Sequence, residues 1–106
     1  MTYELVLDAL GDPTRRLVFN RLSAGPCSVT ALAGGLPVSR PAVSQHLKIL
    51  KQAGLVTDEA MGTRRIYRAD RDGLAVLHAW LDGFQDNALD AYQAEIQRQM
   101  DERKNT

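Results

Sequence analysis

Apolar residues recur three and four positions apart through most of the chain, which is the spacing of one face of a helix. This spacing covers residues 3–10, residues 13–24, a short run at 29–36, residues 40–53, and the long stretch from 74 to about 100. Because helical periodicity dominates and each run is bounded, the pattern predicts five helices. The last is the longest.

Helix boundaries are marked by particular residue types. Asp12, Ser28 and Ser39 each stand just before an apolar-periodic run, where a short oxygen-bearing side chain caps the first free N–H groups. Pro13 follows Asp12 at a position where its missing N–H costs nothing. Gly54 closes the run at 40–53 as a glycine stop.

One region departs from helical spacing. Residues 55–57 and 64–68 are compatible with strands, and they flank the segment DEAMGT. We predict a two-stranded hairpin over residues 55–68, called the wing below, with its tip near Gly62. The expected fold class is therefore mainly α with a small β-hairpin wing.

Residues 28–53 combine a short helix, a three- to four-residue turn and a longer helix, which is the layout of a helix-turn-helix. In that layout the first helix braces the second, whose N-terminal side chains project into a DNA major groove. A hairpin directly after the corner makes the arrangement a winged helix-turn-helix. The pattern thus predicts binding to double-stranded DNA.

Charge supports this prediction although the net charge is zero. Residues 39–68 carry six Lys or Arg against two acids, whereas residues 69–106 carry four against eight. A basic middle can meet a polyanion while an acidic end faces away from it.

Two side chains of the second helix are suited to bind DNA directly. The Gln45 amide can hydrogen-bond to adenine, and the Arg40 guanidinium can bind guanine or a phosphate. The predicted DNA contacts are Ser39, Arg40, Pro41, Ser44, Gln45, His46, Lys48, Lys51, Thr63, Arg64 and Arg65.

Length and composition argue against several other classes of protein. A chain of 106 residues with 44% hydrophobic and 25% charged residues suits one globular domain, residues 1–106. No stretch approaches the ~20 apolar residues of a bilayer span, and no secretory signal is evident, so we expect a cytoplasmic protein. We find no catalytic constellation, and we expect neither an enzyme nor a bound cofactor.

Three segments also carry a family resemblance. LGDPTRR (10–16), SVTALAGGLPVSRPAVSQHLKILKQAGLV (28–56) and GTRRIYR (62–68) resemble the ArsR/SmtB-like winged-helix repressors. The WLD-x-F segment at Trp80–Phe84 is similar to one branch of that family. The resemblance implies a homodimer held by its first and last helices, which binds pseudo-palindromic operators and represses transcription.

The apolar stripes fit that dimer. They occupy both terminal helices, predicted at residues 1–10 and 73–101, and 106 residues are too few to cover them internally. The predicted interface residues are Tyr3, Val6, Leu7, Leu10, Leu77, Leu81, Phe84, Leu89, Tyr92 and Ile96.

The best-known members of this family release DNA when a metal binds, and here the sequence departs from them. The positions that match one family metal site hold Ser28, Thr30 and Ala33 instead of cysteines. The positions that match the other hold Arg71, Gly73, Phe84 and Asn87. None is a good zinc ligand, so we predict no metal site of either kind.

Two alternatives remain at this stage. The corner and wing could form a protein-interaction module, although such interfaces are depleted of charge at their centres. Cys27, the lone cysteine, could make the repressor responsive to thiol oxidation, against the simpler interpretation of a small buried hydrophobic residue. The sequence identifies no small-molecule or redox effector.

Overall fold

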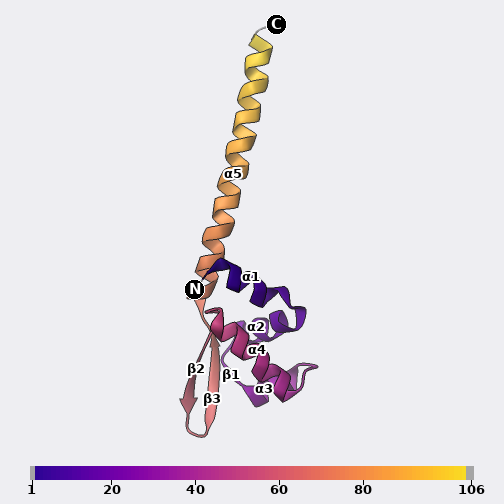
Figure 1. Cartoon of the computed structure of the whole chain (residues 1–106), viewed down its shortest axis with the longest axis vertical. Coiled ribbons are helices and arrows are strands. Elements are labelled where there is room, and N and C mark those ends of the chain that lie inside the picture. Colours follow the sequence, from indigo (N-terminus) through magenta and orange to yellow (C-terminus); the bar gives the residue numbers. More distant parts are fainter. Residues whose placement is uncertain (1, 105–106) are drawn as a thin grey trace.

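The computed structural model describes residues 2–104, apart from the side chains of residues 85–88 and 104. Within that range the chain forms five helices and three strands, which confirms the predicted fold class (Figure 1). In chain order these are α1 (Tyr3–Gly11), α2 (Pro13–Ala24), β1 (Cys27–Ser28), α3 (Val29–Gly35), α4 (Arg40–Gln52), β2 (Val56–Met61), β3 (Arg64–Ala69) and α5 (Arg71–Lys104).

The predicted helix caps form as expected. Asp12 accepts a hydrogen bond from the backbone N–H of Arg15 at 3.0 Å and so begins α2. Ser28 and Ser39 do the same for α3 and α4, at 3.2 and 3.3 Å. Each cap satisfies an N–H that has no partner inside its helix, so these short polar residues fix where the helices begin.

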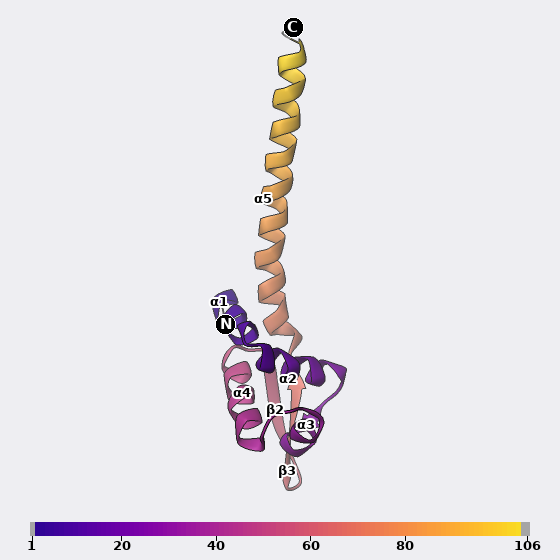
Figure 2. The ribbon, with the colours of Figure 1, turned by 90° about the vertical axis from the view of Figure 1, so that its right-hand side faces the viewer.

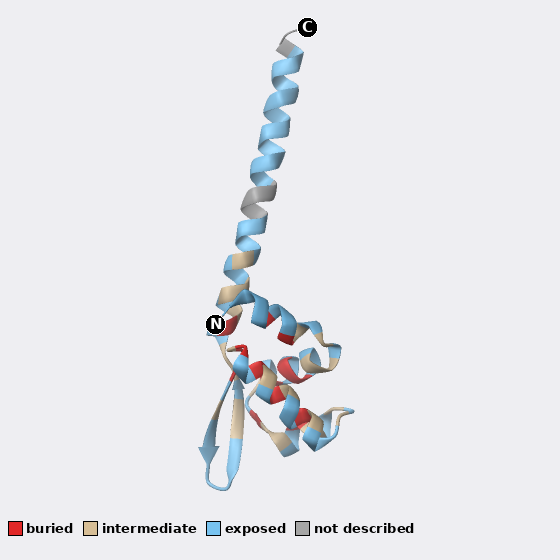
Figure 3. Cartoon of the chain, in the orientation of Figure 1, coloured by how far each residue is buried: buried red, intermediate tan, exposed pale blue. Residues whose placement is uncertain are grey.

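The core lies where α1 to α4 meet the base of the wing (Figure 3). Val43, Leu47 and Leu50 form the predicted inward stripe of α4 and are fully buried. One prediction is wrong here. Val6, predicted at a dimer interface, is 0% exposed within its own chain, because α1 turns this residue towards the core.

The two strands of the wing are longer than predicted. Residues 58–61, expected within the loop, belong to β2, and the turn contains only Gly62 and Thr63. Gly62 has a φ of 64°, in the left-handed region that glycine adopts without steric cost. A third strand, β1, was not predicted; it pairs antiparallel with β3 and gives the sheet order β1-β3-β2.

Helix α5 dominates the shape of the molecule. It begins two residues before the predicted range and ends three residues after it, and it leaves the compact body beside α1 (Figures 1 and 2). The molecule measures 76 × 24 × 21 Å, with the wing tip and the C-terminal end of α5 at opposite ends. In the part of the chain that the structure describes, no helix has both the length and the hydropathy to cross a membrane.

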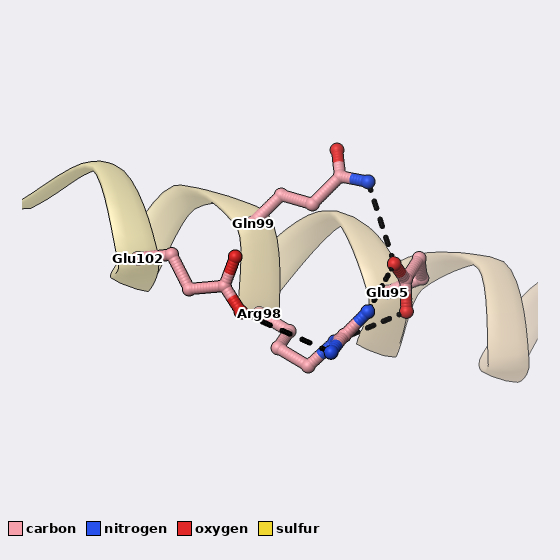
Figure 4. A network of polar contacts seen from close by, with 4 residues as sticks. All are labelled: Glu95, Arg98, Gln99 and Glu102. Carbon is pink, nitrogen blue, oxygen red and sulfur yellow. Dashed lines mark hydrogen bonds and ion pairs between the residues drawn. The ribbon is translucent and has the colours of Figure 1, made fainter.

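Polar contacts within the helix support the projecting part of α5. Glu95 accepts hydrogen bonds from Arg98 and Gln99, and Arg98 also lies 3.8 Å from Glu102 (Figure 4). Contacts three and four residues apart stabilise a solvated helix by a few tenths of a kcal/mol each, about 0.2–0.5. They help α5 to persist beyond the body of the chain.

A close backbone approach joins α5 to the end of α4. Gly73, in the first turn of α5, packs so tightly on Gly54 that a Cβ atom at residue 73 would overlap the carbonyl oxygen of Gly54. Gly54 itself has a φ of 79°. Glycine is therefore required at both positions, for different reasons.

Candidate nucleic-acid interface

The α3–turn–α4 corner presents one face of α4 to solvent. Since the stripe beginning at Val43 points into the core, residues on the other side of the helix must point outwards. A hydrogen bond of 2.8 Å from the N–H of Val38 to the carbonyl of Leu36 closes the turn between the helices. The predicted contact residues exposed on this corner are Ser39, Arg40, Pro41, Ser44, Gln45, Lys48 and Lys51.

His46 lies differently from its neighbours on α4. It is half-buried, and its Nδ1 atom is buried without a hydrogen-bond partner. His46 also lies near enough to Asp12 to influence that carboxyl, whose pKa is held below its usual value mainly by the hydrogen bond from the backbone N–H of Arg15. This position faces the α1–α2 junction, which favours a packing role for His46 over a phosphate contact.

The tip of the wing and the corner enclose a shared cleft of about 380 Å³. Arg40 at the start of α4 lines it from one side, and Arg64 and Arg65 line it from the wing. The start of α3 forms the floor, with Ser28 and the exposed Thr30. Thr30 was not among the predicted contacts. The sequence signal that could have identified Thr30 is its position as the second residue of a helix capped by Ser28.

Ion pairs divide the cations of this region into two groups. Lys51 Nζ lies 2.7 Å from Asp58 Oδ1, and Arg65 Nη1 lies 2.8 Å from Asp58 Oδ2. The hydrogen bond from Lys51, followed by that from Arg65, holds the pKa of Asp58 below its usual value. On the other side of the wing, Arg68 Nη2 lies 3.1 Å from Glu59.

The remaining cations of residues 39–68 are unengaged. Among the described residues, no ion pair includes Arg40, Lys48 or Arg64. All three are exposed, and all three lie on α4 or the wing. They are the charges most readily available to a polyanion.

The predicted dimer residues all lie on α1 or α5. Tyr3 stacks on Trp80 with 5.3 Å between ring centroids, and Phe84 meets Trp80 edge-on at 4.9 Å. Leu10 and Leu77 are half-buried against the core of their own chain. The exposed members of the predicted set are Tyr3, Leu7, Leu81, Phe84, Leu89, Tyr92 and Ile96.

Residues 12–58 match the family model described as "Bacterial regulatory protein, arsR family". The chain is 57% identical over 84 residues to the HTH-type transcriptional regulator Rv2034 of Mycobacterium tuberculosis, an alignment that covers 79% of this chain and 78% of that protein. It is 33% identical to the transcriptional repressor SdpR of Bacillus subtilis, over 74% of this chain and 88% of SdpR. The chain belongs to the ArsR family.

Solved structures agree with this assignment. An ArsR-like transcriptional regulator from Rhodococcus superposes with a TM-score of 0.71 at 34% identity, over 83% of this chain and 86% of that one. A homodimeric winged helix-turn-helix DNA-binding domain from Mycobacterium bovis superposes with a TM-score of 0.65 at 30% identity, over 82% and 81% of the two chains. The chain is thus a DNA-binding transcriptional regulator, which favours that function over a protein-interaction module.

One position that matches a metal site of the best-known ArsR proteins cannot hold a ligand in this structure. Gly73 has no side chain, and the backbone of Gly54 leaves no room for one. Among the described residues no three His, Cys, Asp or Glu side chains are grouped to hold a metal ion. Asn87 lies outside the described side chains. That this ArsR protein has no metal site remains a prediction.

Cys27 is a core residue in this structure. Its side chain belongs to the buried cluster, with 6% of the residue exposed, and its Sγ atom lies 3.6 Å from the carbonyl oxygen of Gly25. Burial keeps an oxidant away from the sulfur. The thiol-responsive alternative therefore gains no support.

Proposed function

We propose that this protein is a homodimeric repressor that places α4 of each subunit in the major groove of a pseudo-palindromic DNA operator. The wing of each subunit would reach into the adjoining narrow groove. A winged corner with its recognition helix exposed is a known means of docking on duplex DNA. The proposal extends the regulator function of the family to particular residues of this chain.

The observation that carries the proposal is where the unpaired cations lie. Arg40, Lys48 and Arg64 are exposed without acidic partners on the corner and the wing, whereas α5 carries seven acidic residues against four basic ones. A cation that has no carboxylate partner can displace counterions from a phosphate at little cost.

The exposed side chains of α4 divide by chemistry into two roles. Gln45 carries a donor and an acceptor together, so it can bind the edge of an adenine, and Arg40 can bind guanine in a bidentate manner or a phosphate. Ser39, Ser44 and Lys48 suit phosphate contacts, which fix the register of the protein on DNA. Arg64, on the projecting wing, suits a narrow groove of strong negative potential.

The apolar surface of α1 and α5 supports the homodimer. Phe84, Leu89 and Tyr92 are each more than half exposed, and large aromatic residues are typical anchors of interfaces between chains. Two subunits related by a twofold axis would present two α4 helices. Their half-sites would lie about 10–10.5 bp apart, centre to centre, or a multiple of that.

Binding measured against salt tests the proposal. An operator is first selected from random duplexes with the full chain, and its affinity is then measured across a range of salt concentrations. Three unpaired cations per subunit predict a slope of log affinity against log salt of about −5 for the dimer, at about −0.9 per phosphate. A flat response, or a protein that stays monomeric at the concentrations used, would contradict the proposal.

A further inference from the structure

Asp58 stands between the two DNA-facing elements and contacts both. It lies on β2, and its side chain is only 7% exposed, whereas those of Lys51 and Arg65 are 56% and 55% exposed. Its two oxygens are divided between the partners, one for Lys51 at the end of α4 and one for Arg65 on β3. The carboxylate therefore bridges the recognition helix and the wing.

The strand register explains why this bridge forms. Residue 58 pairs with Tyr67 and residue 60 pairs with Arg65, so Asp58 and Arg65 are diagonal neighbours on one face of the hairpin. Diagonal side chains in an antiparallel pair are within reach when one of them is long. Because Lys51 meets Asp58 as well, this face of the wing is the one turned towards the end of α4.

Glu59 provides a natural contrast one residue away. Its partner, Arg68, lies diagonally on the opposite face of the hairpin, and both side chains are about half exposed. That ion pair lies wholly within the wing. The two acids of residues 39–68 thus have the same charge and neighbouring positions, but only Asp58 joins the wing to α4.

We propose that Asp58 is a positioning residue that sets how strongly the protein prefers its operator over other DNA. It fixes the wing relative to α4, which favours the one geometry that the operator requires. It also holds Lys51 and Arg65 away from phosphates, which weakens binding to arbitrary sequences. This inference rests on the proposed function.

The two effects of Asp58 act on different complexes. An operator complex needs α4 and the wing at one fixed separation. If the free protein already holds them there, less conformational entropy is lost on binding. A non-specific complex has no such requirement and depends mainly on the number of free cations. Removing the carboxylate should therefore help the second complex and not the first.

The test compares Asp58→Asn with Glu59→Gln in the full chain. Each variant removes one negative charge from the wing with almost no change in shape, but only the first breaks the link to α4. Affinities for the selected operator and for an unrelated duplex of equal length are measured for both variants across a range of salt concentrations. Circular dichroism checks that each variant is folded.

For Asp58→Asn we expect the non-specific salt slope to steepen by up to about 0.9 for each freed cation that reaches a phosphate. At about 0.15 M salt this corresponds to about fivefold tighter non-specific binding per cation. Operator affinity should not rise in parallel, so the ratio of the two affinities should fall about fivefold or more. Glu59→Gln frees Arg68 but leaves the link between the wing and α4 intact, so it should strengthen both complexes equally and leave that ratio unchanged. Asp58→Glu should largely restore the ratio of the unchanged protein.

A second variant keeps the inference testable if Asp58→Asn does not fold. Lys51→Met removes the tether on the α4 side but leaves Arg65 paired with Asp58, so it should lower the preference for the operator without steepening the non-specific slope. Equal ratios for Asp58→Asn and Glu59→Gln would overturn the inference, as would a proportional loss on both duplexes. Failure of the unchanged protein to bind any duplex would instead overturn the proposed function.

Discussion

At the residue scale, Gln45 is the side chain on α4 best suited to distinguish one base from another. It is exposed near the N-terminal end of the helix, two positions before the buried Leu47. Its amide can donate and accept at once, which a phosphate-binding lysine cannot do. A variant of Gln45 therefore tests sequence recognition separately from general attraction to DNA.

Replacing Gln45 with alanine should cost about 1–3 kcal/mol on the operator and relax base preference at one position. Affinities for the operator and for its single-base variants measure both effects. Gln52→Ala is a matched control, because Gln52 is also exposed on α4 but lies in its last turn. Equal weakening of Gln45→Ala on all duplexes would show that Gln45 does not bind a base.

The exposed residues of α4 were largely predictable, because their orientation depends only on the local helical periodicity. Once Val43, Leu47 and Leu50 are recognised as the buried stripe, the periodicity of a helix determines which residues of α4 face outwards. The ion pairs of Lys51 and Arg65 were not predictable in this way. They depend on the register between β2 and β3, which relates residues distant in sequence.

At the scale of elements, the two neighbouring arginines of the wing should differ in their contribution to binding. Arg64 has no acidic partner, whereas Arg65 is held 2.8 Å from Asp58. A cation already paired with a carboxylate gains less from a phosphate, since one favourable interaction replaces another.

Arg64→Ala should therefore make the salt slope on DNA less negative by about 0.9 per subunit. Arg65→Ala should change it by less, and the two variants are compared on one duplex under identical conditions. A larger change for Arg65→Ala would mean that Arg65 leaves Asp58 when DNA binds. In that case the bridge would not persist in the complex.

The elements themselves show which sequence signals are strong. Helices α2, α3 and α4 were predicted almost to the residue, because a capping oxygen and a helical stripe agree at each start. The last four residues of β2, DEAM, were expected as loop, because they project into solvent and show no alternation of apolar and polar residues. β1 has only two residues, too few for any periodicity.

At the scale of the whole molecule, α5 predicts how the subunits assemble. Its outer part has an apolar stripe at Leu89, Tyr92, Ile96 and Met100, which are exposed in the single chain (Figure 3). Spacings of three and four residues place these side chains on one face of the helix. A partner covering that face would bury it.

The double variant Leu89→Glu with Tyr92→Glu should shift the protein towards monomer and weaken operator binding, because charged residues are disfavoured in the centre of an interface. Sedimentation measures the first effect and DNA titration the second. Ala94→Glu, on another exposed face of α5, should change neither. A double variant that stayed dimeric would place the interface elsewhere.

The close contact between Gly73 and Gly54 lies at the base of a long helix. From Gly73 to its last turn α5 extends for about 46 Å, so a change of only about 5° in the direction that this contact sets would move the far end by about 4 Å. In a twofold assembly joined along α5, the same change would alter the distance between the two grooves that the protein can span. Operator spacing would then be controlled by two residues that have no side chain and never touch DNA.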